Sequence, residues 1–141
     1  MPRSETVIKL DTRVLDAMIK NTGGNVAQAV AKVGFAVEAR AKVKAPVDTG
    51  ALRSSIYTSL KGGSKFAEAS AEAHARRPDT RTGPLPVPED DHTAYVGPSV
   101  EYGAAVELGT TRRPATPYLL PAVRETEKEF RKALGDAVKP K

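Results

Sequence analysis

The feature that most constrains the fold is a run of valines spaced like one face of an α-helix. Val26, Val30, Val33 and Val37 recur at the 3.6-residue period, with alanines beside them. Asn25 is a suitable N-cap residue, and Pro46 ends the pattern because the residue before a proline is disfavoured in the helical conformation. The sequence therefore predicts one long amphipathic helix that begins at residue 25 and ends just before Pro46.

The same helix carries a second apolar surface. At about 100° per residue, Phe35 points almost opposite the valines, with Ala31 and Ala39 beside it. Two interpretations are open from the sequence: another part of the chain, such as the C-terminal helix, covers Phe35, or a neighbouring subunit does. We take Ala31, Phe35 and Ala39 as the candidate subunit interface.

Shorter patterns predict a small sheet and further helices. Residues 7–10, 56–60 and 93–97 read as short strands, and Asp11 caps a short helix whose apolar residues extend to Ile19. Ser99 is placed to cap a small helix that Gly109 closes. A final helix starts near 117–121 and shows one apolar stripe, formed by Val123, Phe130, Leu134 and Val138. The predicted fold class is α+β, with N-terminal and C-terminal helices packed on a small antiparallel sheet.

Residues 62–92 interrupt these patterns. The segment opens with Gly62-Gly63-Ser64, contains four prolines and shows no apolar stripe, so residues 67–75 are expected to form a helical turn or two at most. We predict a long inserted loop that is ordered mainly by partners, because it has too little apolar surface to offset its own ordering entropy. Residues 1–141 otherwise form a single domain, as the length of the chain indicates.

Composition excludes several classes of site. There is no cysteine, so disulfides, cysteine zinc sites and cysteine nucleophiles are ruled out. No apolar run approaches the roughly 18 residues of a membrane span, and we expect a soluble protein with no membrane partner. The net charge is +5, but the basic residues are dispersed and lack interleaved aromatics, which is a weak pattern for nucleic-acid binding.

Only one string has a catalytic appearance. Asp48-Thr49-Gly50 matches the Asp-Thr-Gly of dimeric aspartic proteases, in which two carboxylates share a proton and activate water. Here a helix rather than an apolar strand precedes the aspartate, so we interpret the string as a tight turn with a structural Asp48. The acidic run 89–92 lacks the ligand spacing of a calcium loop. We expect no enzyme activity, no catalytic residue, no metal and no cofactor.

Two longer strings carry a family resemblance. The first is Ala-Pro-Val-Asp-Thr-Gly-Ala-Leu-Arg-Ser-Ser-Ile at 45–56. The second is Tyr-Gly-Ala-Ala-Val-Glu-Leu-Gly-Thr at 102–110, followed by Pro-Ala-Thr-Pro-Tyr-Leu-Leu-Pro-Ala at 114–122. Their order and spacing resemble a bacteriophage neck and tail-completion family, typified by the tenth gene product of a lambdoid HK-type phage and related to minor tail protein Z. The family usually has Phe where Tyr118 stands and often a basic residue at Leu120.

This resemblance implies a structural virion protein of a long-tailed phage (a siphophage). Such a protein would lie at the head–tail junction, assemble in the host cytoplasm, and join head and tail or complete the tail as a homo-oligomeric ring, with a hexamer favoured. Its partners would be neighbouring head–tail connector, tail terminator or tail tube proteins, and DNA would pass without specific binding. The motif residues are Pro46, Asp48, Thr49, Gly50, Leu52, Arg53, Glu107, Gly109, Thr110, Pro117, Pro121 and Ala122.

Three other functions are open from the sequence. The nearest is a tail terminator ring protein, which has a similar size and fold class. A basic nucleic-acid-binding module and a dimeric aspartic protease are the more remote alternatives.

Overall fold

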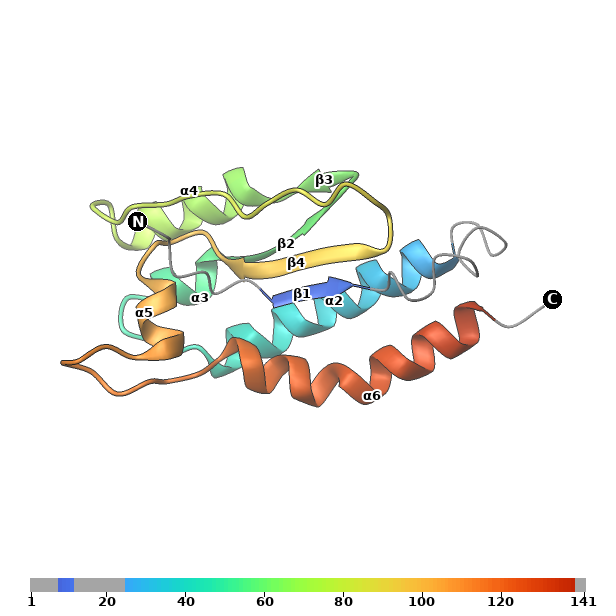
Figure 1. Ribbon diagram of the computed structural model, residues 1–141. Coiled ribbons are helices and arrows are strands. Elements are labelled where there is room, and N and C mark those ends of the chain that lie inside the picture. Colours follow the sequence, from blue (N-terminus) through green and yellow to red (C-terminus); the bar gives the residue numbers. More distant parts are fainter. Residues whose placement is uncertain (1–7, 12–24, 139–141) are drawn as a thin grey trace.

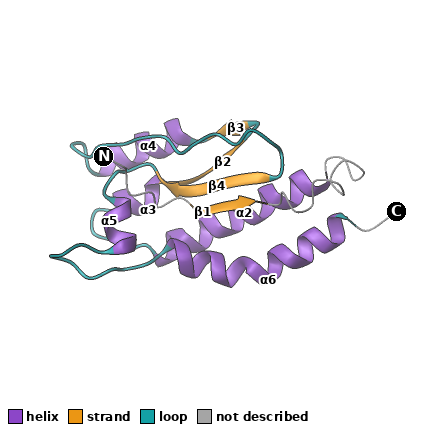
Figure 2. Ribbon diagram, in the orientation of Figure 1, coloured by secondary structure: helices purple, strands orange, loops and turns teal. Residues whose placement is uncertain are grey.

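The computed structural model describes residues 8–11 and 25–138, and its elements form an α+β fold (Figures 1 and 2). An antiparallel sheet has the strand order β1-β4-β2-β3. Its strands are β1 (Ile8–Asp11), β2 (Ile56–Leu60), β3 (Gly63–Ser64) and β4 (Thr93–Pro98). The helices are α2 (Asn25–Lys44), α3 (Ala51–Ser55), α4 (Phe66–Arg76), α5 (Gly103–Leu108) and α6 (Leu119–Ala137).

The sheet separates two apolar layers of unequal size. On one face α2 packs against β2 and β4, and α6 packs on α2 (Figure 1). On the other face lie α4 and the chain that follows it. The side chains of β2 alternate between these layers, because Ile56 belongs to the main core and Tyr57 to the smaller one.

The predicted valine stripe forms the centre of the main core. Val26, Val30, Val33 and Val37 are all buried. Gly34 brings α2 close to the sheet, since a Cβ at this position would lie 3.0 Å from Cγ2 of Thr58. The predicted α2, β2, β4 and α6 are confirmed, as is a strand at the N-terminus. The short helix predicted after Asp11 lies outside the described residues.

The segment 62–92 differs from the predicted long loop. It contains β3 and the whole of α4, whose buried residues are Ala69, Ser70 and Ala73. Such small side chains form a stripe too narrow for a hydrophobicity pattern to detect, although it suffices for close packing against α3.

Contacts within the chain also hold the part of the segment that follows α4. The backbone N–H of Gly83 donates to Ser99 over 2.8 Å, and that of Glu101 donates to Arg81 over 2.9 Å. The backbone N–H of Leu85 donates to the Tyr57 hydroxyl over 2.6 Å, and burial raises the pKa of that hydroxyl. The prediction that partners mainly order this segment is therefore wrong, because its own chain supplies these bonds.

The predicted capping role of Ser99 is also wrong. Helix α5 begins four residues later, at Gly103, and the Ser99 hydroxyl is buried without a hydrogen-bond partner among the described residues. The backbone of Ser99 takes part in the sheet corner instead, because its N–H donates to Ser55 over 2.9 Å.

Candidate functional site

The two halves of the second motif string are hydrogen-bonded to each other around the start of α6. One carboxylate oxygen of Glu107 accepts from the backbone N–H of Tyr118 over 3.1 Å and of Leu119 over 2.6 Å. The first N–H groups of a helix have no partner within the helix, so the Glu107 side chain caps α6 from α5. The Tyr118 hydroxyl donates back to the carbonyl of Gly103 over 2.9 Å.

The loop between α5 and α6 contains a tight turn at 110–113, closed by backbone bonds between Thr110 and Arg113. Gly109 has φ +78°, and a Cβ there would lie 2.7 Å from the backbone N of Ala115. The Thr110 hydroxyl accepts from the backbone N–H of Arg113 over 3.1 Å. Of the remaining motif residues in this part, Ala122 is fully buried, whereas Pro117 is exposed and Pro121 half-buried.

Pro46 and Arg53 of the first string compensate each other at the end of α2. The carbonyl of Lys42 would accept from residue 46 if the helix continued, but proline has no N–H. Nε of Arg53 donates to that carbonyl over 2.8 Å. Arg53 therefore supplies the donor that Pro46 lacks, which explains why the two residue types occur together.

We expect Arg53→Met to lower the free energy of unfolding by about 1 kcal/mol, because the Lys42 carbonyl loses this donor. Equilibrium urea unfolding of the purified protein measures the change. Arg124→Met on the exposed side of α6 is the matched control, with an expected effect within about 0.5 kcal/mol. Equal losses in the two variants would show that the Arg53 bond contributes nothing.

The Asp-Thr-Gly string is a turn that leads into α3. Gly50 has φ +83°, and the Thr49 hydroxyl accepts from the backbone N–H of Ala51 over 3.2 Å. Leu52 is buried in the main core, and Asp48 is exposed. The tight turn is confirmed, but the acceptor that stabilises it is Thr49 and not Asp48.

Thr49→Val is therefore expected to cost about 1 kcal/mol of stability, through loss of this acceptor at the start of α3. Asp48→Asn is expected to change stability by less than about 0.5 kcal/mol, because the exposed carboxylate accepts no backbone bond in the turn. Thermal unfolding of both variants tests the pair. A larger loss in Asp48→Asn than in Thr49→Val would contradict this assignment.

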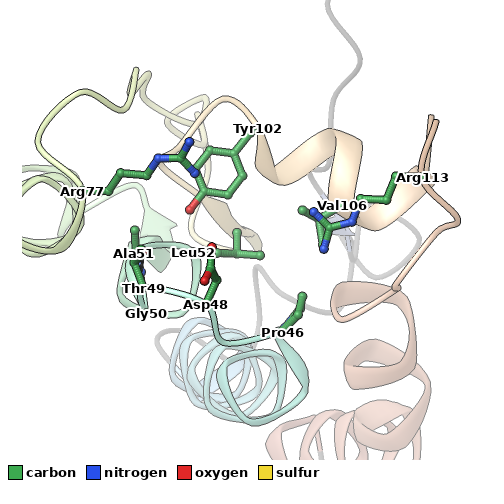
Figure 3. Close-up of a pocket in the computed structure, with 10 residues that line it drawn as sticks. All are labelled: Pro46, Asp48, Thr49, Gly50, Ala51, Leu52, Arg77, Tyr102, Val106 and Arg113. Carbon is green, nitrogen blue, oxygen red and sulfur yellow. Dashed lines mark hydrogen bonds between the residues drawn. The ribbon is translucent and has the colours of Figure 1, made fainter. Parts of the chain in front are cut away.

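A small pocket lies where this turn meets α5 and the end of α4 (Figure 3). We call it the corner pocket; its volume is about 90 Å³. The guanidinium of Arg77 stacks on the Tyr102 ring, 5.2 Å from its centroid. Arg113 reaches the pocket from the other side, next to Val106. The lining residues are Pro46, Asp48, Thr49, Gly50, Ala51, Leu52, Arg77, Tyr102, Val106 and Arg113.

Sequence analysis identified only part of this site. It singled out the turn residues of the first string and included Tyr102 in the second, but it did not predict that Arg77, Tyr102 and Arg113 line one pocket. These three come from separate parts of the chain, and no spacing rule relates them. The doublet Arg112-Arg113 in a short turn was the only local signal.

The candidate interface residues lie on the face of α2 that points away from the core. Phe35 is 43% exposed and is not packed against the main core, Ala31 is half-buried and Ala39 is exposed. Helix α6 instead packs beside Val33, Ala36 and Arg40 on another side of α2. The interpretation that the C-terminal helix covers Phe35 is therefore wrong.

Polar bonds join α2 to α6. Nη1 of Arg40 donates to the hydroxyl of Thr126, a buried residue of α6, over 2.8 Å. Arg40 also pairs with Glu129, and this hydrogen bond lowers the pKa of the Glu129 carboxyl and raises that of Arg40. These contacts fix α6 along α2, whereas Phe35 on another side of α2 stays 43% exposed.

The remaining candidate residues from the sequence are not brought together into a metal site within the described part of the chain. Within residues 8–11 and 25–138, no group of three or more acidic or histidine side chains is placed to hold a metal ion. The Asp90 carboxylate accepts from the backbone N–H of His92 over 3.1 Å, which closes the turn before β4. Asp48 lies between two helices of an α+β fold, not after a strand of an all-β fold, so the geometry does not favour an aspartic protease. None of the helices in the described part of the chain is long and apolar enough to cross a membrane.

Comparison of the chain with protein-family models, with curated proteins and with solved structures finds no match.

Proposed function

We propose that this chain is a structural virion component of a long-tailed bacteriophage, which joins head and tail or completes the tail by assembling into a ring. One observation carries the proposal. The two strings on which the family resemblance rests lie far apart in the sequence, yet both contribute residues to the corner pocket. Residues that form one structural unit are expected to occur together in a family, which supports reading the two strings as a single motif.

The internal bonding of the motif is consistent with assembly rather than catalysis. Glu107, Arg53 and Thr49 each satisfy backbone groups at a helix end. Side chains used in this way hold helices in a fixed arrangement, which suits a structural role. The function would therefore lie in the surfaces that this scaffold presents, with a hexameric ring favoured and neighbouring connector, terminator or tail tube proteins as partners.

Disruption of the reading frame in the parent phage tests the proposal. We expect filled heads and separate tails to accumulate, and electron microscopy of the lysate would reveal them. Supplying the intact gene in trans should restore joined particles. Normal yields of joined, infectious particles without the protein would refute the proposed function.

Phe35 offers a test of ring assembly in the purified protein. Phe35→Asp is expected to abolish self-association while it leaves the subunit folded, because this half-exposed side chain does not belong to the main core. Sedimentation velocity reports the assembly state, and circular dichroism reports the fold. Lys128→Asp on the exposed face of α6 is the matched control and should assemble normally. Normal assembly of Phe35→Asp would exclude this face from the ring contact.

A further inference from the structure

The corner pocket has the chemistry of a socket for an acidic side chain. Arg77 and Arg113 line it together with Asp48, so its lining carries a net charge of +1. Arg113 makes no side-chain hydrogen bond or ion pair within the described residues, and Arg77 has only a 3.7 Å pair with Asp79. At roughly 30 Å³ per water molecule, the volume of about 90 Å³ has room for the end of one side chain.

Exposed aliphatic residues flank this socket. Val47 lies between the lining residues Pro46 and Asp48 and is 59% exposed. Leu108 ends α5, two residues after the lining residue Val106, and is 61% exposed. A polar socket beside exposed aliphatic side chains resembles the centre of a protein–protein interface, where a few anchoring contacts are shielded by apolar neighbours.

The same chain carries a complementary group in the loop before β4. Val87 is 60% exposed, and Glu89 and Asp91 are exposed, with no hydrogen bond or ion pair of their side chains in the described structure. We call these three residues the acidic tip. The exposed valine of the tip can pack on the aliphatic side chains that flank the socket. The two carboxylates can pair with the two arginines that line it.

The socket and the acidic tip lie at opposite ends of the sheet. Helix α3 leads into β2 at Ile56, which pairs with Pro98 at the end of β4, and Tyr102 of the socket follows shortly after. The acidic tip precedes Thr93, the first residue of β4. The six residues of this strand span roughly 20 Å at about 3.3 Å each. Figure 1 shows α3 and α5 near one end of the sheet and the turn into β4 at the other end of the sheet.

We propose that the acidic tip of one subunit inserts into the corner pocket of a second copy of this chain, with Glu89 or Asp91 between Arg77 and Arg113. This inference rests on the proposed function and specifies the contact between subunits. Because the two surfaces differ and lie at opposite ends, the contact is heterologous, the type from which rings are built. Charge-assisted bonds from guanidinium groups to a carboxylate would fix the register of adjacent subunits.

Two variants that each destroy one surface give the sharpest test. Arg113→Glu disables the socket, and Glu89→Ala/Asp91→Ala disables the tip without adding positive charges that would pair with the reversed socket. All three side chains are exposed, so the fold is expected to survive. Each variant alone should self-associate at least tenfold more weakly than wild type by sedimentation velocity. An equimolar mixture should recover association between the two variants, because one retains the intact tip and the other the intact socket. Wild-type assembly by either variant, or a mixture that stays monomeric, would overturn the proposal.

Disulfide trapping detects the contact even when it is weak. Because the chain has no cysteine, Arg113→Cys mixed with Glu89→Cys can form only one heterodimeric disulfide. We expect at least fivefold more of this heterodimer than of the control pair Arg113→Cys and Lys132→Cys, in which the second cysteine lies on α6. Equal yields would overturn the proposed contact.

The outcomes separate this inference from the proposed function. If wild-type protein forms rings that depend on Phe35 but not on Arg113 or Glu89, the tip-to-socket contact is wrong and ring assembly stands. If Arg113→Glu weakens binding to a DNA duplex but leaves self-association unchanged, the socket binds a phosphate and the proposed contact is wrong. Joined particles in the phage that lacks the protein would refute the function itself.

Discussion

Replacing Glu107 with alanine is expected to lower the free energy of unfolding by about 2–4 kcal/mol. Its carboxylate is the acceptor for two backbone N–H groups, those of Tyr118 and Leu119, and both residues are fully buried. A hydrogen bond to a charged group contributes about 1.5–3 kcal/mol, and a buried donor left without a partner carries a desolvation penalty. Urea unfolding followed by circular dichroism measures the loss.

Two controls define what the Glu107 result means. Glu107→Gln keeps a carbonyl acceptor and is expected to lose only about 1 kcal/mol. Glu72→Ala removes an exposed carboxylate from α4 and should change stability by less than about 0.5 kcal/mol. If Glu107→Ala were no less stable than Glu107→Gln, the side chain would not be the cap of α6.

Periodicity predicted the parts of the fold in which large apolar side chains form the buried face. Helices α2 and α6 and strands β2 and β4 all have such faces, and each was predicted close to its observed position. Helix α4 was predicted only as a helical turn or two at 67–75, because Ala69, Ser70 and Ala73 form its buried side. Small residues allow two helices to approach closely, but they produce almost no hydrophobic periodicity in the sequence. The reason this helix forms is therefore visible only in its packing against α3.

The site was harder to predict because its members depend on tertiary contacts. Glu107 looks like a solvated residue of a short helix, and nothing in its neighbourhood indicates that it caps a different helix. Arg53 reaches the Lys42 carbonyl, which Pro46 leaves without a donor, from 11 residues further along the chain, so the bond depends on how the chain folds back. For Asp48 and Thr49, sequence analysis predicted the turn correctly but could not tell which side chain accepts the backbone bond.

Gly103→Ala is expected to destabilise the protein by about 3 kcal/mol, because a methyl group at this position has no room. A Cβ there would lie 2.4 Å from Cγ of Pro98 and 2.9 Å from the hydroxyl oxygen of Tyr118. Overpacking of this kind typically costs about 1–3 kcal/mol, and displacement of the Tyr118 hydroxyl would add the loss of its bond to the Gly103 carbonyl, about 1 kcal/mol.

Gly135→Ala is the matched control for Gly103→Ala, because both glycines lie in helices. A Cβ at Gly135 would meet nothing within 4 Å, so alanine there should stabilise α6 by up to about 1 kcal/mol through its higher helix propensity. The two substitutions are therefore expected to shift the melting temperature in opposite directions, with a drop of roughly 10 °C for Gly103→Ala. An unchanged melting temperature in Gly103→Ala would mean that Pro98 and Tyr118 can move aside, and that the junction of β4, α5 and α6 is not closely packed.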